Sequence, residues 1–172
     1  MKKAIVFIAT SLDGYIARED GSFEWLFTDQ DYGYTPFSTG IDTVVMGRKT
    51  FDVTMSFPEY PHAGQQVYVF SRTRTEAPRD DIVIVNRDPG EFLRELKQQE
   101  GTGNIWIVGG GELLRDLLTA GEIDEFQIAV HPVLLGGGIS LIAPKAKTSW
   151  LNLKACQPYE TGLVMLKYEV IK

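Results

Sequence analysis

Two glycine-bearing turns, each directly after an apolar run, carry the chemistry that this sequence suggests. The first is Val44–Thr50, Val-Val-Met-Gly-Arg-Lys-Thr, and the second is Ile105–Glu112, Ile-Trp-Ile-Val-Gly-Gly-Gly-Glu. Each pattern predicts a buried strand, a turn without side-chain bulk and the start of a helix. A helix N-terminus offers unpaired N–H groups and a partial positive charge, and glycine allows a ligand close to the backbone. Two such turns on one sheet indicate an extended anionic ligand, most simply a dinucleotide.

The residues beside these turns suit phosphate groups. Gly47–Thr50 supplies two cations and a hydroxyl at a predicted helix start, which would bind a pyrophosphate. A third apolar run ends in Ser71–Arg74, where a hydroxyl and arginines suit a phosphate monoester such as the 2′-phosphate of NADP. Each feature taken alone is also typical of a tight connection or of solvated surface. The usual dinucleotide fingerprint is incomplete, because Leu114 stands where its third glycine would be.

The hydrophobic pattern predicts the strands that must position these turns. Runs rich in β-branched and aromatic residues, bounded by turn residues, are typical of strands. Strands that alternate with helices pair in parallel, so the sequence predicts an α/β fold with a mainly parallel sheet. Ligands of such sheets bind at the carboxyl ends of the strands, where both glycine turns stand. We expect strands at Ala4–Thr10, Thr43–Met46, Gln66–Phe70, Ile82–Val85, Asn104–Val108 and Ile123–Val130, and an antiparallel C-terminal hairpin of Leu151–Gln157 and Leu163–Ile171.

Helices are expected between these strands. Asp88–Glu100 begins with a capping aspartate followed by proline, which is a favourable helix start. The segment Leu113–Leu118 carries an apolar stripe at helical spacing, and a short helix should follow Gly47. Asp29–Thr39 also predicts a helix, although the Gly and Pro within it weaken the pattern.

Length and composition exclude several classes of protein. The 172 residues, 44% of them hydrophobic, predict a single domain over residues 1–172 with a sizeable core. A net charge of −6 argues against general nucleic-acid binding, and no apolar run is long enough to cross a membrane. The N-terminus is expected to be a first strand rather than a signal peptide, so the expected location is cytoplasmic. The single cysteine, Cys156, excludes an internal disulfide and is expected to be a buried, inert thiol.

The two histidines carry no metal-binding signal. His62 and His131 each lie beside a proline, and no partner has the spacing of a metal ligand. A structural role in a loop or at a strand end is expected for both, and no metal site is predicted.

Five segments together resemble the dihydrofolate reductase fold, in particular the branch shared with the C-terminal reductase domain of the bacterial riboflavin-biosynthesis enzyme. In order and spacing they cover nearly the whole chain. The resemblance implies a central eight-stranded sheet with flanking helices, which agrees with the strands expected from the pattern. The segments are Ser11–Ala17 (Ser-Leu-Asp-Gly-Tyr-Ile-Ala), Val45–Phe51, Val69–Arg72, Val108–Gly111 and Pro132–Gly138 (Pro-Val-Leu-Leu-Gly-Gly-Gly).

What the resemblance implies is hydride transfer from NADPH. By the same resemblance, the pyrophosphate is held by Gly47, Arg48, Lys49 and Thr50, and the adenosine ribose phosphate by Ser71 and Arg72. The second turn, made of Gly109, Gly110, Gly111 and Glu112, would line the nicotinamide side, with a Gly-Gly peptide that is often cis in relatives. A mobile loop of the relatives touches the nicotinamide at the places of Ile16, Gly21 and Ser22.

The sequence departs from the family where an acid is expected. Dihydrofolate reductases carry a pterin-binding acid about five residues after a tryptophan like Trp25, and Gln30 stands there in this chain, between Asp29 and Asp31. The riboflavin-pathway reductases usually carry a glutamate immediately before a Gly-Gly pair, where this chain has Gly109. Three carboxyls are therefore catalytic candidates: Asp13, which matches best, and Asp29 and Asp31. The aromatic residues Trp25, Phe27 and Tyr32 are expected to bind the substrate.

Each of these acids also has an ordinary structural interpretation. Asp13 precedes a glycine in a pattern typical of turns, and Asp29 and Asp31 are typical helix-capping residues. A carboxyl that donates a proton near neutral pH needs burial to raise its pKa, and an ordered water is the alternative donor.

Three functions follow as hypotheses. The first is an NADPH-dependent reductase of a small heterocycle or imine, most simply of the pyrimidine type that the riboflavin pathway uses, with a dihydrofolate or pterin substrate as the alternative. The second is an NADP-binding module without catalysis, which the departures at Gln30 and Gly109 favour. The third, a structural protein, leaves the phosphate-suited turns unexplained. A β-rich edge is compatible with a homodimer, and no nucleic-acid or membrane partner is expected.

Overall fold

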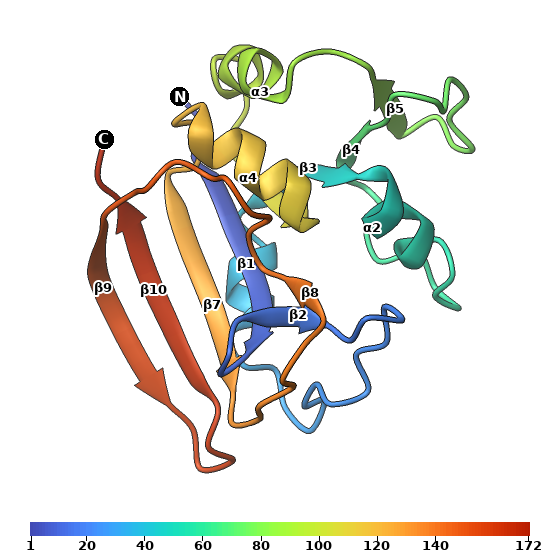
Figure 1. Ribbon diagram of the computed structural model, residues 1–172. Helices are drawn as coiled ribbons and strands as arrows, with labels where there is room; N and C mark the ends of the chain where they lie inside the picture. Colours follow the sequence, from blue (N-terminus) through green and yellow to red (C-terminus); the bar gives the residue numbers. More distant parts are fainter.

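The computed structural model describes residues 1–172 and is built on one central eight-stranded sheet (Figure 1). The strand order is β5-β4-β3-β6-β1-β7-β10-β9. Pairing is parallel from β5 to β7 and antiparallel from β7 through β10 to β9. This confirms the predicted α/β class, the mainly parallel sheet and the C-terminal hairpin. The strands are β1 (Ala4–Ser11), β3 (Ile41–Gly47), β4 (Gln66–Phe70), β5 (Ile82–Val85), β6 (Asn104–Gly109), β7 (Glu125–His131), β9 (Leu151–Pro158) and β10 (Val164–Val170).

Four helices and a second small sheet complete the fold. The two-stranded sheet pairs β2 (Tyr15–Ala17) with β8 (Ile139–Ser140). Helix α3 begins as predicted, because the Asp88 side chain accepts the backbone N–H of Glu91 at 2.9 Å and Pro89 stands in the first turn. The helices are α1 (Tyr34–Ser38), α2 (Arg48–Thr54), α3 (Pro89–Lys97) and α4 (Gly111–Thr119).

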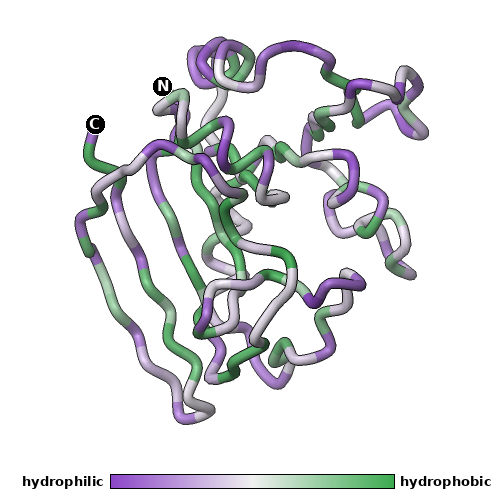
Figure 2. The backbone as a smooth tube through the Cα atoms, in the orientation of Figure 1, coloured by the Kyte–Doolittle hydropathy of each residue, from purple (hydrophilic) through white to green (hydrophobic).

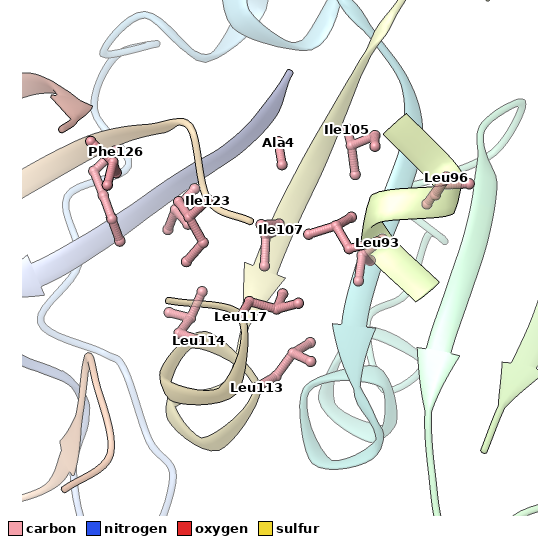
Figure 3. Close-up of a cluster of buried hydrophobic side chains, with 13 residues drawn as sticks. Ala4, Leu93, Leu96, Ile105, Ile107, Leu113, Leu114, Leu117, Ile123 and Phe126 are labelled. Atoms are coloured by element: carbon pink, nitrogen blue, oxygen red, sulfur yellow. The ribbon is translucent and has the colours of Figure 1, made fainter. Parts of the chain in front are cut away.

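The central strands are buried on both faces, and a separate core lies on each face. On one face α3 and α4 pack against β1 and β6, where Leu93 and Leu114 meet Ile105 and Ile107 (Figure 3). On the other face α1 and α2 contribute Phe37 and Phe51 to a second cluster. A parallel sheet covered on both faces explains the near-continuous apolar runs of these strands. Because α2 and α4 directly follow β3 and β6, this packing also fixes the two glycine turns.

The predicted helix at Asp29–Thr39 is mostly wrong. Only Tyr34–Ser38 is helical, and residues 29–33 form a loop. Gly33 has a φ of 84° and Tyr32 a φ of 49°, so the chain turns through the left-handed region just before α1. The Asp31 carboxylate then accepts the backbone N–H of Thr35 at 3.0 Å. Asp31 therefore fixes the start of a shorter helix.

The prediction for Cys156 is half right, because the residue lies in a strand but is exposed. β9 is the last strand of the sheet, and all of its residues are exposed. The sequence pattern marks the strand but gives no sign that nothing covers it. The strand expected at Ile123–Val130 also differs slightly, since β7 begins at Glu125.

The helices are short. None of them combines the length and the apolar character that a membrane crossing would need.

Candidate functional site

The two glycine turns lie in contact with each other at one end of the sheet. β3 and β6 are neighbouring parallel strands, so Gly47 and Gly109 end side by side. A Cβ atom added to Gly47 would lie 3.6 Å from the backbone nitrogen of Gly110 and 3.7 Å from the carbonyl oxygen of Gly109. A Cβ added to Gly110 would lie 3.4 Å from the Thr50 hydroxyl. Two chain segments far apart in sequence thus form one backbone-lined surface.

The peptide bond between Gly109 and Gly110 is cis, as the resemblance implies for a Gly-Gly pair at this place. Gly109 has a φ of 126°, a conformation that L side chains rarely adopt, so this position requires glycine. Gly111 is equally restricted by space, because its Cβ would lie 2.6 Å from the carbonyl oxygen of Ser140.

Both helices begin at this surface without a side-chain cap. Gly47 and Gly110 are the N-cap residues of α2 and α4, and neither provides a capping hydrogen bond. The first N–H groups of each helix therefore keep their capacity to donate to a ligand. Lys49 and Glu112 are exposed in the first turns of the two helices. Because Glu112 is acidic, its side chain does not favour an anion, and only its backbone N–H suits one.

Two arginines are joined beside the first turn by one carboxylate. Arg48 Nη1 donates to Asp52 Oδ2 at 2.8 Å, and Arg74 Nη2 donates to Asp52 Oδ1 at 2.9 Å. The Arg74 guanidinium also lies 5.4 Å from the ring centre of Phe51. Arg72, which the resemblance selects, is exposed and forms no ion pair in the structure. Sequence reasoning noted Arg74 in the motif but did not select it, and only the fold shows that it joins Arg48.

Ser71 lies at the end of β4, next to β3 in the sheet, and is buried. Its hydroxyl oxygen accepts the backbone N–H groups of Thr73 at 3.3 Å and Arg74 at 2.9 Å. These bonds form a turn that directs the chain toward Asp52 and leave the hydroxyl proton available to donate.

The small sheet of β2 and β8 connects the segment after β1 to the start of α4. Ile16 lies half-buried in β2, which pairs with β8. The residues after β8 reach α4, since the backbone N–H of Ala143 donates to the Gly111 carbonyl at 3.0 Å. Gly21 has a φ of 84°, and the Ser22 hydroxyl donates to Asp20 Oδ1 at 2.6 Å, so both form the turn after β2. Ile16 and Gly111 are therefore linked through β8, whereas Gly21 and Ser22 are half-buried in the turn after β2.

None of the three candidate acids is a buried carboxyl. Asp13 is exposed, and hydrogen bonds from the Ser11 hydroxyl and the backbone N–H groups of Gly136 and Leu135 hold its pKa below the usual value. The Tyr32 hydroxyl lowers the pKa of exposed Asp29, and the hydroxyl and backbone N–H of Thr35 lower that of exposed Asp31.

None of the three carboxyls therefore has the burial that a proton donor near neutral pH would need, which favours the ordered water of the two donors considered from the sequence. A lowered pKa keeps each of the three groups ionised near neutral pH. Asp13 ties the end of β1 to the loop after β7, a long-range contact that the turn interpretation did not include. Asp31 accepts the backbone N–H of Thr35 in the first turn of α1, which is close to the helix-capping role considered from the sequence.

The aromatic candidates gather around a histidine that sequence reasoning did not select. Phe27 lies 5.0 Å from the His131 ring and 6.4 Å from that of Tyr32, and Trp25 lies 5.4 Å from His131. The backbone N–H of Phe27 donates to His131 Nε2 at 3.1 Å, while His131 Nδ1 lies 3.1 Å from the carbonyl oxygen of Ala129. An acceptor Nε2 and a donor Nδ1 define one neutral tautomer.

His131 is buried, and burial lowers its pKa. It therefore fastens the loop that carries the aromatic residues to the end of β7. His131 directly follows the strand predicted at Ile123–Val130, and this position was the signal in the sequence for its role. The sequence could not show which segment packs against it.

Comparison with known proteins gives a consistent set of similarities. A model of the RibD C-terminal domain family matches residues 2–165. The uncharacterized protein YwjB of Bacillus subtilis (strain 168) is 38% identical over 162 residues, which cover 92% of each chain.

Two solved structures extend the comparison. A protein of Shewanella sp. PV-4, provisionally described as a riboflavin biosynthesis protein, superposes with a TM-score of 0.87 at 31% identity over 99% of each chain. Dihydrofolate reductase from Enterococcus faecalis, complexed with NADP(H), has a TM-score of 0.72 at 16% identity, covering 99% of this chain and 97% of its own. The second similarity concerns the fold alone.

Proposed function

The chain belongs to the RibD C-terminal domain family, and from this premise we propose that it is an NADPH-dependent reductase of a small heterocyclic or imine substrate. The pyrimidine-type substrate of riboflavin biosynthesis is the first choice. The observation that carries the proposal is the contact between the two glycine turns beside the Arg48–Asp52–Arg74 cluster. Backbone donors and paired guanidinium groups at one end of a sheet suit a phosphorylated dinucleotide.

The donor set fits NADPH in two parts. In this proposal Gly47, Arg48, Lys49 and Thr50 bind the pyrophosphate, since they combine backbone N–H groups, a hydroxyl and two cations. The hydroxyl proton of Ser71 and the guanidinium groups of Arg72 and Arg74 bind the phosphate on the adenosine ribose. The second turn, Gly109–Glu112, would lie against the nicotinamide half. Its backbone presents no side chain before Glu112, so a ring can approach closely.

The chemistry that the coenzyme supplies when bound is a hydride. The residues of this chain would provide binding and orientation: the two turns would hold the coenzyme, and Ile16 in β2 would contact it. Exposed Phe27 supplies aromatic surface for a flat substrate, and Trp25 packs against His131. Tyr32, which was also expected to bind the substrate, is only 8% exposed and packs against Ala129 and Leu163, so its ring supports Phe27 instead. Because Asp13, Asp29 and Asp31 stay ionised near neutral pH, we assign proton delivery to an ordered water rather than to a carboxyl.

The proposal is tested by titrating the protein with NADPH and with NADH while following tryptophan fluorescence. We expect saturable binding with a clear preference for NADPH. Arg48→Ala should weaken NADPH binding by about 10-fold to 100-fold, the range for loss of a hydrogen bond to a charged group, about 1.5–3 kcal/mol. Arg87→Ala is the matched control, because Arg87 pairs with exposed Glu95 and lies outside the proposed site. Absence of any NADPH response would overturn the proposal.

Two alternative functions can be tested on the same protein sample. A dihydrofolate or pterin substrate agrees with the similarity in fold to dihydrofolate reductase, but Gln30 stands where the pterin-binding acid is expected. An NADP-binding module without catalysis agrees with Gln30, with Gly109 and with the three ionised acids. NADPH oxidation with a panel of pyrimidines, pterins and quinones distinguishes them, since the module would bind NADPH and oxidise it with none. A cytoplasmic location, where reduced coenzyme is present, fits each of these functions.

A further inference from the structure

The turn between β9 and β10, residues 159–162, lies against the loop that precedes α1. Tyr159 of the turn packs edge-on against Tyr32 of the loop, with ring centres 4.9 Å apart and an angle of 75° between the rings. The hydroxyl oxygens of Tyr32 and Thr161 lie 3.1 Å apart. The chain is hydrophilic to neutral through this turn (Figure 2), so an aromatic ring and a hydroxyl make the contact with the loop.

The direction of the hydrogen bonds follows from the groups that meet at Tyr32. Its hydroxyl oxygen also lies 2.7 Å from Asp29 Oδ1. An ionised carboxylate can only accept, so Tyr32 donates its single hydroxyl proton to Asp29. The Thr161 hydroxyl must therefore donate to Tyr32. This chain of two hydrogen bonds joins the hairpin turn to the loop.

The Tyr32 ring lies in a small core of its own. It is buried together with Ala129 of β7 and with Leu163, which directly follows the hairpin turn. The φ of 49° at Tyr32 lies in the left-handed region, which a bulky residue adopts only where its surroundings require it. Contacts of the side chain, and not the preference of the backbone, therefore fix the loop at this residue.

The same loop is fixed at a second point by His131. The backbone N–H of Phe27 is bound to the His131 ring, while the Phe27 side chain is 36% exposed and lies 6.4 Å from the Tyr32 ring. Pro132, the next residue after His131, contacts the hairpin turn, since a Cβ added to Gly162 would lie 3.2 Å from Pro132 Cγ. The Phe27 ring is thus placed between two attachment points that are themselves in contact.

We propose that Tyr32, Tyr159 and Thr161 are positioning residues, which orient the Phe27 ring and thereby set the affinity for a flat heterocyclic substrate. This inference rests on the proposed function, in which Phe27 supplies the surface for that substrate. A substrate is aligned with a hydride donor only when the surface that binds it is fixed. β1 and β7 separate the hairpin from β6 and its glycine turn in the sheet, so the cluster acts on the substrate and not on the coenzyme.

Thr161→Val tests this link, because it removes the donated proton at nearly constant volume. The binding probe is 5,6-diaminouracil, a flat pyrimidine, which is titrated calorimetrically into protein saturated with NADPH. We expect Thr161→Val to weaken binding of the probe by about 2-fold to 10-fold, the range for one hydrogen bond. The affinity for NADPH itself should stay unchanged. Thr161→Ser keeps the hydroxyl and should restore the affinity of the wild type for the probe.

Three further variants separate the hydrogen bond from general effects of substitution. Tyr32→Phe removes the hydroxyl at the other end of the same bond, so adding Thr161→Val to it should cause no further loss of probe affinity. Tyr159→Leu removes the edge-on ring and should also weaken probe binding. Thr148→Val is the matched control, because Thr148 is an exposed threonine outside this cluster.

Hydrogen exchange in residues 26–33 measures how firmly the loop is held, with no ligand present. We expect faster exchange there in Thr161→Val and no change in Thr161→Ser or Thr148→Val, and circular dichroism checks that each variant is folded. Unchanged exchange in Thr161→Val, unchanged probe affinity, or an equal loss of NADPH and probe affinity would each overturn the proposal. A wild type that binds no NADPH would overturn the proposed function instead, and the exchange rates would still decide whether the hairpin turn holds the loop.

Discussion

Asp52 is the residue on which the expected coenzyme preference most depends. It holds Arg48 and Arg74 together, and all three side chains are partly exposed, so the ion pairs themselves add little to stability. The two ion pairs instead position the arginines, because the Asp52 carboxylate fixes both guanidinium groups at a site where a phosphate would contact them.

Arg74→Ala is therefore expected to reduce the preference for NADPH over NADH by about tenfold, with little change in NADH affinity. Arg72→Ala should have a smaller effect, since Arg72 has no partner that fixes it. Equilibrium fluorescence titrations with both coenzymes measure the two ratios. An equal loss of NADPH and NADH affinity would show instead that Arg74 does not face the ribose phosphate.

His131 gives a prediction about pH. Burial lowers the pKa of His131, and burial also lowers that of His62, so both are neutral in the folded protein near neutral pH. Below a pH of about 6.5 the unfolded chain binds protons that the folded chain does not, so the free energy of unfolding should fall as the pH decreases. Above that pH the contribution is fully present.

His131→Asn should make the free energy of unfolding depend less on pH, because one of the two buried histidines is removed. Urea denaturation at several pH values measures this dependence. The same variant should weaken the attachment of Phe27 and alter substrate KM more than NADPH affinity. A pH dependence identical to that of the wild type would contradict the assignment.

At the scale of elements, the glycines of the two turns have different physical requirements. Gly111 has backbone within 2.6 Å of a Cβ position, whereas Gly47 has only ordinary contacts and a φ of −79° that any residue adopts. The fold therefore needs glycine at position 111 but not at position 47, where the close approach of the proposed coenzyme would be the reason for it.

This contrast predicts that two similar substitutions affect different properties, stability in one case and coenzyme binding in the other. Gly111→Ala should lower the free energy of unfolding by more than about 1 kcal/mol, because α4 and the residues after β8 must move apart. Gly47→Ala should change it by less than about 0.5 kcal/mol, as for a substitution without strain, yet weaken NADPH binding. Chemical denaturation and coenzyme titration of both variants provide the comparison.

The elements also show what the sequence could predict. Strand positions and the start of α3 followed from hydrophobic pattern and capping, because both are local properties of the chain. The helix at Asp29–Thr39 failed because the conformations of Tyr32 and Gly33 override the local pattern. The contacts that Arg74 and His131 make could not be predicted, because each depends on which distant segment packs nearby. The exposure of Cys156 could not be predicted either, because it depends on no segment covering β9.

At the scale of the whole molecule, coenzyme binding should stabilise the folded state by mass action. At a free NADPH concentration 100 times the dissociation constant, the gain is about 2.7 kcal/mol. For a chain of this size that corresponds to a rise in Tm of roughly 5–10 °C. A thermal-shift measurement should show this rise with NADPH and a smaller one with equal NADH. No shift with either coenzyme would contradict the proposed binding.

The order of strands in the sheet has a consequence for how the chain could be divided. β1 lies between β6 and β7, so the first strand of the polypeptide completes its sheet only with strands that follow residue 103. A cut in the exposed turn between α3 and β6 would leave two fragments, each carrying one of the glycine turns. Neither fragment could finish the sheet alone, and co-expression should restore it. The protein is thus a natural candidate for a split reporter whose reassembly a nucleotide would promote.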